Sequence, residues 1–152
     1  MEKLVLKNKK AFHDYHIIDS LEAGISLIGK EVKSIREGKM NIKESYCRYI
    51  KGELFLIQSH ISQYSHVGHS GFSEYDPLRM RKLLLHKQEL RKWKKKVDTQ
   101  GLTIVPLKVY WRDNHVKVEI ALVKGKKLHD KRNDMAKRDA KRNMARQLGN
   151  KF

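Results

Sequence analysis

The chain has 152 residues, of which 39% are hydrophobic and 34% are charged. This length supports one domain with a single hydrophobic core, without disulfides or a structural metal. Lysine and arginine number 34 against 17 acidic residues, a formal net charge of +17, which favours a polyanionic partner, above all a nucleic acid, and leaves RNA and DNA both open.

The cysteine content and the N-terminus narrow the class further. Cys47 is the only cysteine, which excludes a disulfide framework and a thiolate metal site. It falls within a predicted strand, where a buried and inert thiol is expected. The first residues lack the apolar run of a signal peptide, and no segment is long and apolar enough to span a membrane. We therefore expect a cytoplasmic protein.

The N-terminal part of the chain predicts a strand followed by a short helix. Residues 1–10 carry four lysines around a small apolar cluster and are interpreted as an exposed lead-in. Alternation over residues 11–28 predicts a long strand, in which Gly24 marks a bulge or a bend. Residues 29–39 change to a helical period and end near Gly38, which predicts a short basic helix.

The middle of the chain predicts a hairpin and a loop. Lys51 and Gly52 separate two runs rich in β-branched and aromatic residues, 46–50 and 53–57, and such a two-residue spacer is a hairpin signal. Residues 63–76 are rich in Gly, Ser and His without periodicity, which predicts a long loop.

A second helix follows, and its start has two alternatives. Asp76 and Pro77 form a signal for a cap and a first turn. Equally, residues 82–85 could stay extended, with the helix beginning near His86. Apolar residues then recur at spacings of three and four, and Gly101 ends the segment in either case.

The last elements predict another hairpin and, with it, the fold. Alternating apolar residues over 105–111 and 116–122 flank a turn at Asp113 and Asn114. Pro106 cannot donate to a strand ladder, so its strand is expected to run along an edge. Three strands, a helix and two strands is the order of an OB-fold. We therefore predict a mainly β protein with helices, an OB-fold-like antiparallel barrel, with an α+β sandwich as the alternative.

No motif supports catalysis. The acidic residues are scattered, and neither a pair spaced to hold Mg²⁺, a Gly-rich phosphate loop nor a flanked nucleophile is present. His60, His66 and His69 suggest a zinc site, but their spacing is irregular and no second cluster completes it. An enzyme stays possible, but the residues alone give it no positive support.

Two basic segments favour nucleic-acid binding. Residues 79–96 hold nine Lys or Arg and one acid, Glu89, so like charges repel along the predicted helix and an anion would relieve them; the alternative is a solvated helix face. Trp93 on this helix is expected in the core. Residues 124–152 hold eleven Lys or Arg and three acids, a net charge of +8. We divide the chain into a barrel, 1–123, and a basic tail, 124–152, expected to be disordered when free and helical against a partner.

Five stretches, in order, resemble one family. They are LKNKKAFHDYHI, LEAGISLIGKEVKSIREGKMNIKESY, DPLRMRKLLLHKQEL, GLTIVPLKVYW and KVEIALVKGKKLHDKR. Together they are similar to the SmpB family of SsrA-binding proteins, and the resemblance runs from Leu6 to Arg132. It implies a bacterial and cytoplasmic RNA-binding protein with an OB-fold-like barrel, which is not an enzyme and needs no metal. We expect this protein to be a monomer and to take no cofactor or small-molecule substrate. Such a protein binds the tRNA-like domain of transfer-messenger RNA (SsrA RNA) and delivers it to stalled ribosomes for trans-translation, which tags the unfinished peptide.

The resemblance implies specific RNA contacts on the barrel. Glu22, Leu84 and Lys117 stand at positions that the family uses to bind transfer-messenger RNA. A lysine on the polar side of a strand suits a phosphate. The carboxylate of Glu22 cannot hold one, so we expect it to contact a base edge or a 2′-hydroxyl, or to orient a neighbouring lysine. The same RNA is expected to contact Asn8, Lys9, Lys10, His13, Tyr15, Lys33, Arg36, Asn41 and Lys87.

The resemblance also implies that the basic tail enters the small ribosomal subunit. GKKLHDKR, residues 125–132, would meet ribosomal RNA in the decoding region, with a helix beyond it in the empty message channel. Many relatives have Tyr in place of His129; either ring can stack, but histidine makes the contact sensitive to pH. The expected contacts are Gly125, Lys126, Lys127, His129, Asp130, Lys131, Arg132, Lys137, Arg138, Arg142 and Arg146.

Two other classes stay open from the residues alone. A general basic RNA binder, such as a ribosomal protein or a single-strand binder, would show no preference for a tRNA-like fold. A nuclease or an RNA-modifying enzyme would show turnover or dependence on a divalent metal. Only the series of motifs separates the favoured class from these two.

Overall fold

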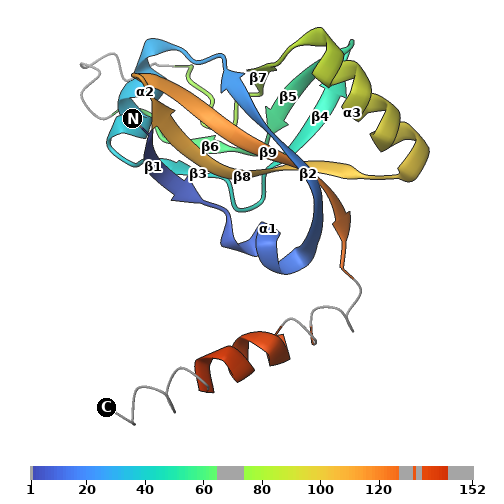
Figure 1. The fold of residues 1–152 in the computed structure, drawn as a ribbon. Helices are drawn as coiled ribbons and strands as arrows, with labels where there is room; N and C mark the ends of the chain where they lie inside the picture. The colour runs from blue at the N-terminus through green and yellow to red at the C-terminus, as the bar shows by residue number, and fades with distance from the viewer. Residues whose placement is uncertain (1, 65–73, 127–131, 133–134, 144–152) are drawn as a thin grey trace.

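The computed structural model describes residues 2–64, 74–126, 132 and 135–143. Its elements in chain order are β1 (Glu2–Lys7), α1 (Lys9–Asp14), β2 (Tyr15–Ile25), α2 (Gly29–Arg36), β3 (Met40–Asn41), β4 (Tyr46–Ile50), β5 (Glu53–Ile57), β6 (His60–Ile61), β7 (Arg81–Leu84), α3 (Lys87–Gln100), β8 (Thr103–Arg112) and β9 (His115–Gly125) (Figure 1).

The strands form a closed antiparallel barrel. The sheet order is β1-β8-β4-β5-β7-β2-β9, and β8 also pairs with β9, so the sheet closes on itself. β1 adds to β8 beside this ring, and β3 pairs with β6 in a separate small sheet. The predicted OB-fold-like barrel is therefore confirmed. Figure 1 shows α2 and α3 at opposite ends of the barrel, with α1 below it.

Both predicted hairpins are confirmed, and their turns explain why they form. Lys51 and Gly52 have φ values of 50° and 80° between β4 and β5. Asp113 and Asn114 have φ values of 48° and 66° between β8 and β9. Two successive residues with positive φ make the tight turn whose twist matches that of the flanking strands, and Gly, Asn and Asp tolerate it best.

The first 28 residues differ from the prediction. Residues 2–7 are no exposed lead-in but the strand β1, which pairs with β8 about one hundred residues later. The predicted strand over 11–28 begins only at Tyr15, because α1 occupies residues 9–14. Asn8 caps this helix, since its side-chain oxygen accepts from the backbone N–H of Ala11 at 3.2 Å. A six-residue helix is too short to give a clear helical period.

One expectation about the strands is wrong in place, and another holds only locally. The register shift in β2 lies between Ile17 and Asp19, not at Gly24. β8 pairs with β9 on one side; on the other side it pairs with β4 at Ile104 and with β1 over residues 108–112, so Pro106 lies in the gap between these two pairings. Pro106 fits into β8 at a register shift against β9, and bulges are the other position in a sheet where the missing N–H is tolerated.

The second of the two alternatives for the long helix is right. Residues 81–84 form β7, and α3 begins after His86, whose backbone N–H donates to Glu89 at 3.1 Å. Gly101 ends the helix in the left-handed conformation with φ of 63°. Trp93 is 2% exposed, which confirms its place in the core.

The apolar residues form two clusters. The main core fills the barrel and includes Leu56, Val118 and Ile120. A second, smaller cluster lies under α1, where Ala11 packs against residues of β8 and β9. The prediction that the Cys47 thiol is buried is confirmed. Burial raises the pKa of this thiol well above the ordinary range of a cysteine.

Some predicted features fall partly outside the described residues. Most of the predicted loop, residues 65–73, lies outside them, as do 127–131, 133–134 and 144–152 of the tail. In the described part of the tail, residues 135–143 are helical and exposed. No helix within the described ranges is long and apolar enough to cross a membrane.

Candidate nucleic-acid interface

Four surface hollows follow one another around the barrel. The first, of about 230 Å³, lies where β2, β7 and β9 meet, and the second, of about 620 Å³, lies between α2, β1 and the β8–β9 turn; both include Trp111 and Asn114. β1 leads from the second hollow to a third of about 260 Å³ beside α1 and β3. A fourth, of about 120 Å³, shares Asn8, Lys10 and Lys43 with the third. We call these four the hollow track.

Leu84 and Lys117 meet in the first hollow, around Gly24. Gly24 on β2 pairs with Leu84 on β7 and with Lys117 on β9. A Cβ atom on Gly24 would lie 3.2 Å from the Cβ of Leu84. The glycine therefore allows the Leu84 side chain to stand beside the strand, where it is 51% exposed. Two residues far apart in sequence become one apolar and cationic corner.

Glu22 lies two residues before this corner, and its carboxylate is held by other side chains. Tyr110 donates its hydroxyl to Oε1 at 2.5 Å, and Arg112 donates Nη1 to Oε2 at 2.9 Å. Burial and the hydrogen bond to Glu22 raise the pKa of Tyr110. Arg112 also pairs with Glu2 at 2.5 Å. The carboxylate thus orients an arginine, a role close to the lysine-orienting role expected from the sequence.

Two cations of α2 lie over aromatic rings. The guanidinium of Arg36 is 5.3 Å from the centroid of Trp111, beside the second hollow. The ammonium of Lys33 is 5.4 Å from the centroid of Tyr64. At such distances a ring quadrupole attracts a cation and limits its freedom. Of the two, only Arg36 lines the hollow track.

The predicted residues of α1 and its surroundings gather at the third and fourth hollows. Asn8 is buried, and its amide donates to the carbonyls of Ile42 and Pro106 at 3.3 and 3.0 Å. Its side chain is thus used inside the protein, where it holds α1 in place. Lys9 and Lys10 on that helix are exposed. A hydrogen bond to Glu44 at 2.8 Å raises the pKa of Lys10.

The other predicted residues of this region have internal contacts. His13 Nδ1 lies 2.9 Å from the carboxylate of Asp14, and Tyr15 packs against the smaller core cluster. Asn41 accepts from the backbone N–H of Lys43 at 2.8 Å and lines the third hollow. Lys87 is exposed at the start of α3 and lies outside the hollow track.

The start of the basic tail is attached to α1. Gly125 ends β9 opposite Tyr15, and the backbone N–H of Lys126 donates to the carbonyl of Asp14 at 2.9 Å. Of the other predicted tail contacts, Arg132, Lys137, Arg138 and Arg142 are exposed and helical. Those outside the described residues are Lys127, His129, Asp130, Lys131 and Arg146.

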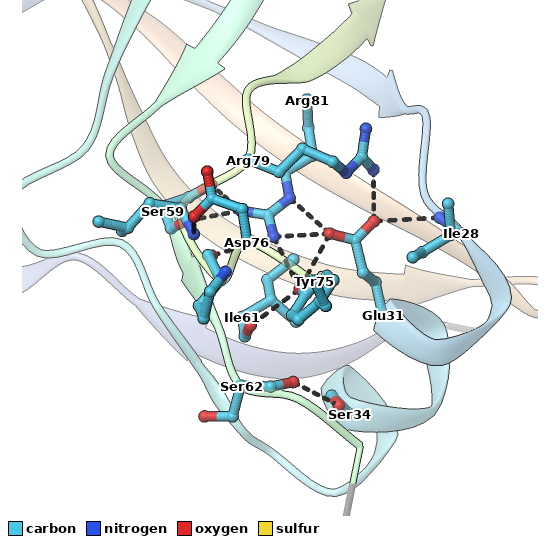
Figure 2. Close-up of polar contacts among 12 residues, drawn as sticks. Ile28, Glu31, Ser34, Ser59, Ile61, Ser62, Tyr75, Asp76, Arg79 and Arg81 are labelled. Atoms are coloured by element: carbon cyan, nitrogen blue, oxygen red, sulfur yellow. Dashed lines mark hydrogen bonds and ion pairs between the residues drawn. The ribbon is translucent and has the colours of Figure 1, made fainter. Parts of the chain in front are cut away.

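Sequence reasoning missed a buried ion-pair cluster that fixes α2 (Figure 2). Glu31 and Arg81 are both fully buried and pair at 2.6 Å. Arg79 pairs with the other carboxylate oxygen of Glu31. Arg81 also donates to the carbonyl of Ser59 at 2.5 Å and to the hydroxyl of Tyr75 at 2.9 Å. The cluster ties α2 to β7 and to the segment before it, so it sets the position of Arg36.

Opposing effects act on the Glu31 carboxyl. Burial by itself favours the neutral form. Hydrogen bonds from Arg79, from the backbone N–H of Ile28 and from Arg81 outweigh this effect, so the pKa lies below its ordinary value. A buried charge of this kind needs partners on every side. In the sequence, Glu31 has only the helix-start signal of an acid three residues after Ile28.

Sequence reasoning also missed three lysines of the hollow track. Lys3 and Lys7 come from β1, which was taken for an exposed lead-in, and Lys43 follows β3. The pairing of β1 with β8 places Lys3 at the second hollow and Lys7 at the third. Their sequence signal was the lysine content of residues 1–10.

Among the described residues, no group of three or more His, Cys, Asp or Glu side chains could hold a metal ion. His60 is exposed on β6, and His66 and His69 lie outside the described ranges.

Comparisons with known proteins agree with the fold and with the motifs. The family model described as "SmpB protein" matches residues 5–150. An SsrA-binding protein of Carboxydothermus hydrogenoformans is 49% identical over 148 residues, which cover 97% of each chain. One of Geotalea uraniireducens is 51% identical over 144 residues, 95% of this chain and 93% of that one. A solved structure described as "tmRNA-SmpB: a journey to the center of the bacterial ribosome" is 46% identical with a TM-score of 0.65, covering 81% of this chain and 85% of the other. The chain therefore belongs to the SmpB family.

Proposed function

We propose that this protein binds the tRNA-like domain of transfer-messenger RNA and delivers it to stalled ribosomes for trans-translation and peptide tagging. It acts in the bacterial cytoplasm as a monomeric, non-catalytic RNA-binding protein. Membership of the SmpB family carries the proposal, since full-length relatives at 49% identity have the name SsrA-binding protein. A similar chain is solved under a description that joins tmRNA, SmpB and the ribosome.

The geometry of the hollow track supports this function. Its four hollows contain or adjoin most of the predicted RNA contacts, among them Leu84, Lys117, Arg36 and Lys10. Exposed cations, half-exposed aromatic rings and shallow hollows together suit a folded RNA whose backbone and unstacked bases are both contacted. A single deep pocket with converging catalytic groups would instead suit an enzyme.

The predicted residues divide into two roles under this proposal. Direct RNA contacts are assigned to side chains that are exposed or, for Lys117, half-buried, namely Lys9, Lys10, Lys33, Arg36, Asn41, Leu84, Lys87 and Lys117. A positioning role is assigned to Glu22 and Asn8, because both side chains are used in hydrogen bonds within the protein. His13 and Tyr15 fall between the two roles, direct contact and positioning. Both residues lie beside the point where the tail is attached to α1.

The basic tail has the second task in this proposal. Residues 125–132 contact ribosomal RNA in the decoding region, and the helix beyond them occupies the empty message channel. The attachment of Lys126 to α1 supports this division, because it fixes where the tail leaves the barrel. The exposed row of Arg138 and Arg142 on the tail helix suits contacts to phosphates.

The test compares binding of the full chain to the tRNA-like domain, to an ordinary tRNA and to an unrelated hairpin, over a range of salt concentrations. We expect a preference for the tRNA-like domain that persists as salt rises. We also expect truncation after Arg132 to spare this binding and to abolish peptide tagging. Equal affinities that fall together with salt would contradict the proposal and indicate a general basic RNA binder, since counterion release treats all phosphates alike.

A further inference from the structure

One face of the helix α3 has no role in the packing of the core. Its core-facing side carries Trp93, with Leu90 and Val97 packed against the main core. Successive residues on a helix lie about 100° apart, so Arg91, Lys92 and Lys95 stand on the opposite side, and all three are exposed. We call these three residues the outer face of α3.

The acidic residues of α3 are occupied elsewhere. Asp98 pairs with Lys94 at 3.0 Å, on the flank of the helix. Glu89 accepts from the backbone N–H of His86 and thereby closes the start of the helix. Among the described residues, no ion pair includes Arg91, Lys92 or Lys95. Within the described part of the chain, the outer face therefore carries three positive charges that no acidic side chain pairs with.

This arrangement does not serve the stability of the helix. Arg91 and Lys95 are four residues apart and Lys92 and Lys95 three apart, and like charges at these spacings repel. Cations stabilise the last turn of a helix, where they meet the negative end of its dipole. The last turn of α3 contains no basic residue. The charges are thus placed for an external anion.

The outer face suits a phosphate backbone and offers nothing to stack a base. Trp93 is buried. Tyr49, an aromatic residue beside α3, donates its hydroxyl to the carbonyl of Leu90 and has the ammonium of Lys94 over its ring at 5.4 Å. Proteins that hold single strands use exposed aromatic rings, whereas RNA helices are recognised through phosphates and shape.

The outer face is separate from the hollow track. No residue of α3 lines any of the four hollows. Helix α3 lies at the end of the barrel opposite to α2, which carries Arg36 (Figure 1). An RNA bound along the hollow track therefore leaves the outer face of α3 open to a second partner.

We propose that the outer face of α3 binds the phosphate backbone of a ribosomal RNA helix while the hollow track holds the tRNA-like domain. This inference rests on the proposed function, because delivery to the ribosome is what brings a second RNA to a protein already loaded with the first. The partner is a ribosomal RNA helix because the outer face binds its anion when the tRNA-like domain already occupies the hollow track.

The test uses the full chain with Arg91→Gln, Lys92→Gln and Lys95→Gln combined. Glutamine is nearly as good a helix former as lysine and arginine. The unfolding temperature should equal or exceed that of the wild type, since repulsion is relieved. The matched control is Arg91→Lys, Lys92→Arg and Lys95→Arg, which keeps all three charges. Binding is measured to two ligands, an RNA duplex and purified ribosomal small subunits. The duplex has about 20 base pairs, which is long enough to present two successive minor grooves. Each measurement is made with the tRNA-like domain bound to the protein and without it.

We expect the neutralised variant to bind the duplex and the subunits at least about tenfold more weakly, with a salt slope reduced by about 3, one for each lost phosphate contact. The control should bind like the wild type, and affinity for the tRNA-like domain alone should stay unchanged in both variants. Unaltered binding of duplex and subunits by the neutralised variant would overturn the proposal. So would an equal loss of affinity for the tRNA-like domain, which would make the outer face of α3 part of the first site.

Binding to full-length transfer-messenger RNA is measured as well, because it shows which RNA supplies the helix that the outer face binds. If the wild type binds it more tightly than the tRNA-like domain and the neutralised variant loses this gain, the outer face contacts another part of the same RNA, and the ribosomal assignment is wrong. Failure of the proposed function is a different result, namely no preference of the wild type for the tRNA-like domain over ordinary tRNA. The duplex comparison without the tRNA-like domain still decides the outer face in that case.

Discussion

Glu31 of α2 and Arg81 of β7 form an ion pair at 2.6 Å, fifty residues apart in sequence, and neither side chain is exposed. The pair sits at the centre of a cluster that joins α2, β7 and the segment from Tyr75 to Arg79. It fixes the helix from which Arg36 reaches the hollow track. The position of this part of the proposed RNA surface therefore depends on the buried ion pair.

Replacing Glu31 with Gln should strongly destabilise the protein. The substitution leaves the guanidinium of Arg81 buried without its counter-charge, and breaking such a pair from one side costs about 3–5 kcal/mol. Urea denaturation followed by tryptophan fluorescence measures the free energy of unfolding. Glu44→Gln is the matched control, because Glu44 pairs with Lys10 at the surface and exposed ion pairs of this kind contribute little to stability. Equal effects of the two substitutions would show that the buried pair is unimportant.

The same carboxylate predicts a loss of stability in acid. The pKa of Glu31 in the folded protein lies below its ordinary value, so its stabilising contribution is present above the unfolded pKa, about 4.3, and is lost as the pH falls through the folded pKa. We expect the free energy of unfolding of the wild type to fall more steeply than that of Glu31→Gln below about pH 4.3. Parallel curves for the two proteins, measured by urea denaturation down to about pH 3, would contradict this assignment.

Gly24→Ala should weaken RNA binding through Leu84. The added methyl group would lie 3.2 Å from the Cβ of Leu84, so the leucine must shift away from the first hollow, at a stability cost of roughly 1–3 kcal/mol for overpacking. We expect a loss of affinity for the tRNA-like domain similar to that of Leu84→Ala. The combined Gly24→Ala and Leu84→Gly variant should be no worse than Leu84→Gly alone, because glycine lacks the Cβ atom that the added methyl group meets. Losses that add would mean that Gly24 itself lies against the RNA.

Trp111 should report RNA binding by its fluorescence. Its ring lines both the first and the second hollow under Arg36, whereas Trp93, the only other tryptophan, is buried in the core. In a Trp93→Phe variant, titration with the tRNA-like domain should change the emission of Trp111. A Trp111→Phe variant, which keeps only Trp93, should show little change under the same titration. The reverse pattern would move the RNA from the hollow track toward α3.

The local elements of the barrel could be read from the sequence because their signals are local. Lys51-Gly52 and Asp113-Asn114 specify their turns by residue type, and the strands on both sides alternate with the period of two. Gly101 marks the end of α3 in the same way. The motif series then led to the SmpB family, and with it to Leu84 and Lys117, whose place beside Gly24 no local pattern contains.

Pairings between distant segments could not be predicted from local patterns. β1 was missed because its partner β8 lies about one hundred residues away, and a short lysine-rich run has no amphipathic period of its own. Pro106 indicated an edge, but the strand β8 has neighbours on both sides for most of its length, and only the gap between its pairings with β4 and β1 leaves Pro106 at a local edge. Glu31 and Arg81 each look like ordinary surface residues until the fold removes water from both.

The sequence by itself determined the basic charge, the barrel class, the hairpins and the family, because turn chemistry, alternation and motif order are properties of neighbouring residues. The tertiary structure alone decided which cations share a surface. Pairing of β1 with β8 places Lys3 and Lys7 on the hollow track, and packing of Trp93 turns Arg91 and Lys95 outward on α3. The physical reason is that strand pairing and core burial join residues far apart in the chain, and only these long-range contacts fix which charges stand side by side.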